Sequence, residues 1–154
     1  MKMEIRKATK KDFNSVLKLE RMWEKEGISW SVKHPGKKEL IKHLTKDFVY
    51  LAISGEKFLG HIIALIKKAD KILDYAEIKK NEKFGYIDGV YVVPRYRKLG
   101  IGKLLVKKII SDFKKQKIKK IVLKATSKKL KQLESFYNKL GFESKFVDIV
   151  MRIR

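Results

Sequence analysis

The stretch Tyr86-Ile-Asp-Gly-Val-Tyr-Val-Val-Pro94, followed directly by Arg95-Tyr-Arg-Lys-Leu-Gly-Ile-Gly-Lys-Leu-Leu105, decides how this chain folds. Its first part is rich in aromatic and β-branched residues, which predicts a buried strand. Pro94 ends that strand because proline has no N–H group to donate. A glycine turn and a helical pattern follow, and the free N–H groups of a first helical turn attract an anion. We therefore expect a phosphate-binding turn, in which Gly100 and Gly102 let the ligand approach the backbone closely.

Two common phosphate-binding motifs do not fit this turn. A dinucleotide-binding loop has the pattern G-x-G-x-x-G with an acidic residue about twenty positions later. Here Leu105 stands at the third glycine, and Lys119 and Lys120 stand where the acid belongs. A P-loop continues its Gly-Lys pair with Ser or Thr, but Leu104 follows Lys103. A tight turn that binds no ligand remains the alternative for the glycines taken alone.

The turn resembles a third motif, the acetyl-coenzyme A loop of the Gcn5-related N-acetyltransferases. That family carries Arg/Gln-x-x-Gly-x-Gly/Ala between a strand and a helix, and Arg97-Lys-Leu-Gly-Ile-Gly102 matches every fixed position. The segment Phe136-Tyr-Asn-Lys-Leu-Gly-Phe142 resembles the family's late helix, which ends Tyr-x-x-x-Gly-Phe. Ile5-Arg-Lys-Ala-Thr9, followed by Asp12, is similar to the family's opening. The resemblance thus covers nearly the whole chain, and it implies a single acetyltransferase domain over residues 1–154.

The composition fits one domain with a hydrophobic core. The chain has 154 residues, of which 44% are hydrophobic, and this argues against disorder although 36% are charged. It contains no cysteine, which excludes disulfides, zinc–thiolate sites and cysteine nucleophiles. The histidines His34, His43 and His61 show no metal-ligand spacing, so we expect no metal. Neither a signal peptide nor a long apolar run is visible, which favours a cytoplasmic protein.

The net charge of +22 has two interpretations. One is a lysine-coated surface, such as that of a protein from a thermophile. The other is an anionic partner such as RNA or DNA. Lysines occur in every segment, and net charge alone says little about specific function, so we favour the first interpretation.

Sequence periodicity predicts a mixed, mostly antiparallel sheet with helices on both faces, similar to the fold of this family. We expect six to seven strands. Besides the central one, the predicted strands are Met3–Ala8, Phe48–Ile53, Phe58–Ile66, Ile118–Ala125 and Phe142–Ile153. One predicted helix opens with a capping box, Thr9-Lys-Lys-Asp12, and the others begin at Lys37, after the glycine turn, and after Ser127 as a cap. A short helix near Ile72–Ile78 is expected in a lysine-rich excursion.

The resemblance implies direct transfer of acetyl from acetyl-coenzyme A to a primary amine. It implies that the diphosphate lies on the N–H groups of the glycine turn and that the pantetheine arm pairs with the central strand. A backbone N–H of that strand would stabilise the developing oxyanion. The expected coenzyme-binding residues are Tyr91, Val92, Val93, Arg97, Lys98, Leu99, Gly100, Ile101, Gly102 and Lys103.

Two side chains are candidates for proton transfer. Tyr137 matches the family's general acid, which protonates the thiolate leaving group. Asp88 lies where some family members carry a glutamate base, and pairing with a lysine is its alternative role. An alkyl ammonium has a pKa of about 10.4, so the acceptor amine needs help to lose its proton. Simple strand alternation would put Asp88 on the same face as Val90 and Val92.

The sequence alone leaves three questions open. Trp30 follows the first predicted helix, where the family often builds part of the acceptor pocket, but a packing role is its alternative. Leu130 stands where the family usually has an asparagine that touches the coenzyme, and Thr126 or Ser127 is a candidate substitute. The acceptor, a small-molecule or protein amine, is not specified, and the resemblance allows a homodimer. A non-catalytic module of the same fold that binds RNA or another polyanion is the competing function.

Overall fold

The computed structural model describes residues 2–28, 35–145 and 151. Within these residues one five-stranded sheet has the order β1-β2-β3-β4-β5. The strands are β1 (Glu4–Lys7), β2 (Phe48–Ser54), β3 (Lys57–Lys68), β4 (Lys83–Val92) and β5 (Ile121–Leu123). Neighbouring strands from β1 to β4 are antiparallel, whereas β5 runs parallel to β4. The predicted mixed, mostly antiparallel sheet is thereby confirmed.

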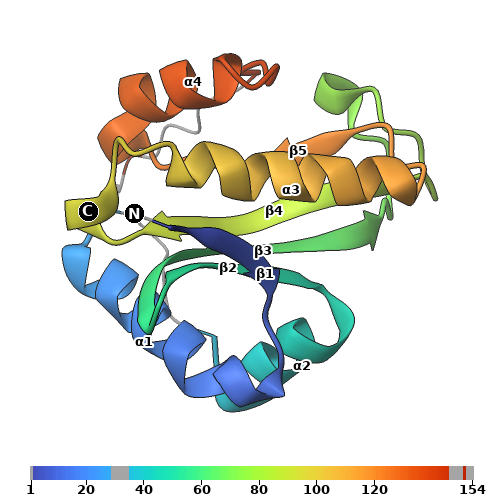
Figure 1. The fold of residues 1–154 in the computed structure, drawn as a ribbon. Helices are drawn as coiled ribbons and strands as arrows, with labels where there is room; N and C mark the ends of the chain where they lie inside the picture. The colour runs from blue at the N-terminus through green and yellow to red at the C-terminus, as the bar shows by residue number, and fades with distance from the viewer. Residues whose placement is uncertain (1, 29–34, 146–150, 152–154) are drawn as a thin grey trace.

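Helices cover both faces of this sheet, as predicted (Figure 1). The helices α1 (Phe13–Glu26) and α2 (Lys37–Lys46) lie on one face. The helices α3 (Ile101–Lys115) and α4 (Leu130–Asn138) lie on the other. None of the helices in the described ranges is long and apolar enough to cross a membrane.

The core follows from the apolar stripe of α3. Ile101, Leu105, Ile109 and Phe113 are all buried and pack against the inner face of the sheet. Gly85 of β4 makes room for the Phe113 ring, since a Cβ at position 85 would lie 2.3 Å from Phe113 Cε2. A second buried cluster, including Val16, Leu19 and Leu40, lies under α1 and α2. The two clusters hold β4 between them.

The predicted number of strands is not reached in the described residues. A sixth strand was expected over Phe142–Ile153, but its described beginning, Phe142–Lys145, is not a strand. Residues 146–150 and 152–154 lie outside the described part. The excursion between β3 and β4 holds a short 3-10 helix, Asp74–Ala76, which is closed by a bridge between Leu73 and Ile78. This is close to the short helix expected there.

The start of α1 is held by an ion pair. Both carboxylate oxygens of Asp12 accept hydrogen bonds from the Arg6 guanidinium, at 2.7 and 2.9 Å. Asp12 Oδ2 also accepts the N–H of Thr9, at 2.8 Å. These contacts, the hydrogen bond from Arg6 first, lower the pKa of Asp12 to about 2. They fix the end of β1 relative to α1.

We expect this ion pair to make the free energy of unfolding depend on pH in the acidic range. Because the folded-state pKa is lowered, the contribution of Asp12 is complete above about pH 4 and is lost as pH falls towards 2. The Asp12→Asn variant should lose about 1–2 kcal/mol at pH 7, a discounted figure because Arg6 is partly exposed. Urea unfolding at pH 7 and pH 2.5 measures this. The exposed Asp70→Asn is the control, and an equal loss at both pH values would contradict the assignment.

Candidate active site at the open edge of β4

The central strand has a free edge beside its last residues. Pairing between β4 and β5 ends at Ile87 and Leu123. From Asp88 onward, β4 therefore has no strand partner on that side in the described chain. The N–H of Val93 donates to Leu59 O of the β3 side, at 2.9 Å. Hydrogen bonding alternates along an antiparallel strand, so the N–H groups of Val90 and Val92 are directed to the free edge.

A β-bulge lies where this free edge begins. Ile63 of β3 pairs with Gly89 and the next residue, Ala64, pairs with Ile87, which leaves Asp88 as the extra residue of β4. Val90 and Val92 pack towards the α3 side of the sheet. Gly89 instead faces α1, since a Cβ there would lie 2.6 Å from the Trp23 ring.

Because of this bulge, the Asp88 side chain lies on the opposite face of the sheet from the one predicted. The titratable neighbours of its carboxyl include His43 and Glu39 of α2 and Glu20 of α1. Asp88 therefore faces the α1–α2 side, opposite to Val90 and Val92, and not the same face as expected. Simple alternation fails because the extra residue shifts the side-chain pattern by one position.

The environment of Asp88 suits a proton acceptor. The side chain is exposed and makes no hydrogen bond or ion pair with the described residues, so the lysine pairing considered above is not seen. Although the residue is exposed, the protein around it removes part of the water from the carboxyl, and this raises its pKa above the ordinary aspartate value. Glu20 and Glu39 raise it further, while His43 and Lys67 lower it. A carboxylate with a raised pKa binds a proton more strongly than an ordinary one.

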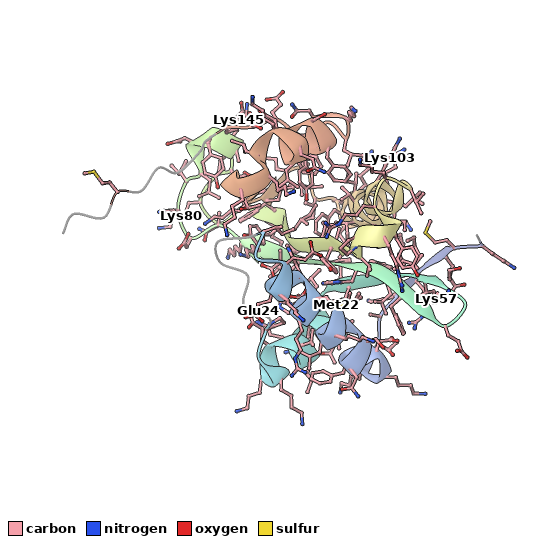
Figure 2. The ribbon with its side chains drawn as sticks, turned by 90° about the vertical axis from the view of Figure 1, so that its left-hand side faces the viewer. Met22, Glu24, Lys57, Lys80, Lys103 and Lys145 are labelled. Carbon is pink, nitrogen blue, oxygen red and sulfur yellow. The ribbon has the colours of Figure 1, made fainter. Side chains whose placement is uncertain are left out.

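The glycine turn presents unpaired N–H groups to the outside. Among the described residues, no N–H group from Lys98 to Lys103 donates to another group of the protein, and the first bond of α3 is Leu104 N–H to Gly100 O. Gly100 adopts a left-handed φ of 79° and has open space where a Cβ would stand. No acidic residue lies in the first turn of α3. Lys103 projects outward at this end of the helix (Figure 2). The turn therefore fits a phosphate group.

Gly102 brings three elements together. A Cβ on Gly102 would lie 3.4 Å from the Phe136 ring of α4 and 3.8 Å from Val92 of β4. The glycine turn, the free edge of β4 and the helix that carries Tyr137 are thus in contact. This joins the two sequence motifs that lie far apart along the chain.

The Tyr137 ring is packed among other aromatic rings, but its hydroxyl has no hydrogen-bond partner among the described residues. The ring makes edge contacts with Phe136 and Phe142, at centroid distances of 4.9 and 5.5 Å. Its hydroxyl makes no hydrogen bond with any described residue. Burial raises the pKa of Tyr137 to about 12, so the phenol keeps its proton at neutral pH. A protonated, unpaired hydroxyl is available to a ligand.

The side chains of Arg97 and Tyr91 are directed to α1 rather than to the turn. Arg97 Nη2 donates to both carboxylate oxygens of Glu26, each at 2.8 Å, and Nε donates to Val92 O, at 2.8 Å. The Tyr91 hydroxyl donates to Glu26 Oε1 at 2.6 Å. Tyr91 also stacks on Trp23, with ring centroids 5.9 Å apart. Both side chains are thus already paired within the protein through Glu26 of α1.

The remaining residues considered in the sequence analysis lie outside the described chain or have structural contacts. Trp30 lies outside the described residues. Leu130 begins α4, and Thr126, a candidate to replace the missing asparagine, accepts the N–H of Lys128 at 3.3 Å. His61 is fully buried in β3 and bonded to Glu20, which fits a packed structural histidine. No group of three or more metal-ligating side chains occurs in the part of the chain that is described.

Sequence reasoning missed the acidic residues of α1. Glu20 and Glu26 lie on the helix face that packs on the sheet, and Glu20 is buried. A glutamate on the apolar side of an amphipathic helix was the available signal, because such a residue needs a partner. The partner itself was not readable from the sequence.

The chain is similar to known acetyltransferases. The acetyltransferase (GNAT) family model matches residues 13–142. A predicted acetyltransferase from Clostridium acetobutylicum, solved with acetyl-CoA, is 22% identical, with a TM-score of 0.72 and coverage of 99% of this chain and 96% of that chain. A GCN5-related N-acetyltransferase from Ralstonia eutropha JMP134 is 22% identical, with a TM-score of 0.74 and coverage of 99% of both.

A third similar structure is an aminoglycoside acetyltransferase from an uncultured soil metagenomic sample, in complex with trehalose. It is 18% identical, with a TM-score of 0.70 and coverage of 99% of this chain and 97% of that chain. At these identities the structural similarity shows a shared fold. The family match extends over most of the chain and includes the glycine turn and Tyr137. This chain belongs to the GNAT acetyltransferase family.

Proposed function

We propose that this protein transfers the acetyl group of acetyl-coenzyme A directly to a primary amine. The observation that carries the proposal is the row of unpaired N–H groups from Lys98 to Lys103, placed beside a strand edge that has no partner among the described residues. The first feature suits a diphosphate, and the second suits an extended arm that pairs with β4. The coenzyme supplies the activated acetyl group, and the protein orients it.

The acceptor amine approaches from the α1–α2 side in this proposal. Asp88 faces that side at the start of the free edge and accepts the proton that the ammonium must lose. An ammonium near pKa 10.4 is also attracted by the carboxylates of Asp88 and Glu20. The N–H of Val90 or Val92, directed to the free edge, stabilises the negative charge that develops on the acetyl oxygen.

The leaving thiolate lies on the opposite side, next to α4. Tyr137 donates its hydroxyl proton there. With a phenol near pKa 12 and a thiol near 8.5, using cysteine as a guide, the transfer is uphill by about 3.5 units, or about 5 kcal/mol. The gap is smaller in the site, because the apolar surroundings that raise the pKa of Tyr137 also raise that of a buried thiol.

The proposal is tested by following thiol release from acetyl-coenzyme A. The purified protein is offered a panel of amines that includes aminoglycosides, polyamines, amino acids and peptide amino termini. Release that depends on one class of amine is the expected result. A protein that ignores acetyl-coenzyme A and binds RNA with a steep salt dependence would instead support the non-catalytic alternative.

We expect the Asp88→Asn variant to be defective in a pH-dependent way. Loss of the base should lower kcat/KM by about 10–100-fold at pH 7, and the loss should shrink towards pH 10, where the amine deprotonates unaided. Because the pKa of Asp88 is raised, the acid limb of the wild-type pH profile should lie above the ordinary aspartate value of 3.8. The amine found in the panel serves as substrate. A loss that is equal at every pH would argue against a base.

A further inference from the structure

Arg97 connects the phosphate turn to α1 through Glu26. The guanidinium is bound on two sides, by the Glu26 carboxylate and by the carbonyl of Val92. Glu26 is the last residue of α1, and it lies 71 positions from Arg97 in the chain. The side chains of Arg97 and Glu26 are 35% and 21% exposed, so the pair is partly shielded from water. Hydrogen bonds between two charged groups, as between this guanidinium and this carboxylate, are about twice as strong as those between neutral groups.

The position of Arg97 gives this pair a specific consequence. Arg97 directly precedes the N–H groups that we assign to the diphosphate, and its own N–H donates to Pro94 O at 3.1 Å. The next residue, Lys98, adopts a positive φ of 63°, which is strained for a residue other than glycine. A strained turn persists only where its surroundings hold it. Here the hydrogen bonds of the Arg97 side chain to Glu26 and to Val92 O stabilise the turn.

Two further contacts fix the carboxyl end of α1. Glu26 Oε1 also accepts the Tyr91 hydroxyl, so one carboxylate joins α1, β4 and the turn. Lys128, just before α4, donates to the carbonyl of Gly27 at 2.7 Å. The end of α1 is therefore bonded to β4, to the glycine turn and to the segment before α4.

From these contacts we propose that Glu26 is a positioning residue of the coenzyme site, which acts through Arg97 to hold the turn in its binding conformation. The inference rests on the proposed function. Glu26 itself does not touch the coenzyme. Arg97 serves the diphosphate by placing the backbone N–H groups, more than by direct contact.

The test measures the affinity for coenzyme A by calorimetry. The variants are Glu26→Gln, Arg97→Gln and the double variant, since Gln keeps the volume of Glu and removes its charge. Glu26→Gln should weaken coenzyme A binding by about 5–20-fold. The double variant should bind within about twofold of Arg97→Gln alone, because the two residues act in one unit.

Two further readouts separate positioning from general stability. The loss in Glu26→Gln should be the same for ADP as for coenzyme A, since the two share the diphosphate. The kcat at saturating coenzyme should stay within about twofold of wild type, with the effect confined to KM. The exposed pair Glu143–Lys145, 2.6 Å apart, provides the control: Glu143→Gln should change neither affinity.

The failures are distinguishable. If the wild-type protein takes up no coenzyme A, both the proposed function and this inference are wrong. If the wild type binds coenzyme A and Glu26→Gln binds it equally well, only the inference is wrong. Effects of the two single variants that multiply in the double variant would also overturn it, because independent sites add their free energies.

Discussion

Replacement of Tyr137 by Phe should reduce turnover by about 100-fold or more and leave coenzyme A affinity within about twofold of wild type. The hydroxyl makes no hydrogen bond with the described residues, so its removal breaks no contact with them. The ring keeps its contacts with Phe136 and Phe142. What is lost is the proton for the leaving thiolate. Steady-state kinetics, together with calorimetry, measures the two quantities separately.

The matched control is Tyr86→Phe. Tyr86 is also partly buried and lies on β4, but it packs against the cluster of Ala69, Ile78 and Phe84, away from the glycine turn. Removal of its hydroxyl, which is an electrostatic neighbour of Asp88, should change turnover far less than removal of the Tyr137 hydroxyl. Thermal unfolding should show both variants to be as stable as wild type, since no hydrogen-bond partner is left unsatisfied. Full activity of Tyr137→Phe would show that the proton comes from elsewhere.

The parts of the fold that depend on local sequence were predictable. The strand, the proline and the glycines that precede α3 act within a few residues of one another, and each has a direct physical meaning. The same holds for the end of α1, where Gly27 adopts a left-handed φ of 61°. The hairpin of β2 and β3 was readable because two apolar runs flank a short turn with Gly55.

The orientation of Asp88 was predicted wrongly, although one signal was present in the sequence. A glycine inside a strand often marks a bulge or a close approach, and Gly89 follows Asp88 directly. Here both meanings apply, because the strand bulges and Trp23 packs on Gly89. The partner of Arg97 was beyond sequence reasoning, since Glu26 is 71 positions away and only the tertiary fold brings them together.

The placement of the diphosphate is tested most strongly at Gly102. The Gly102→Asp variant should weaken coenzyme A binding by about 100-fold or more, because the new carboxylate repels a diphosphate bound on the neighbouring N–H groups. The fold should survive, since an acidic residue in the first turn of a helix is favourable by about 0.3–1 kcal/mol. The loss should diminish at high ionic strength as salt screens the repulsion.

Two companion variants isolate the effect of charge at Gly102. Gly102→Ala adds a Cβ 3.4 Å from Phe136, so the ring must shift slightly, and affinity should fall by no more than about tenfold. Ser111→Asp adds the same charge to an exposed position of α3 about 13 Å further along the helix, and it should not matter. If Gly102→Asp binds coenzyme A as well as Gly102→Ala does, the diphosphate does not lie on this turn. A negative charge so close to a bound diphosphate would lower the affinity for coenzyme A.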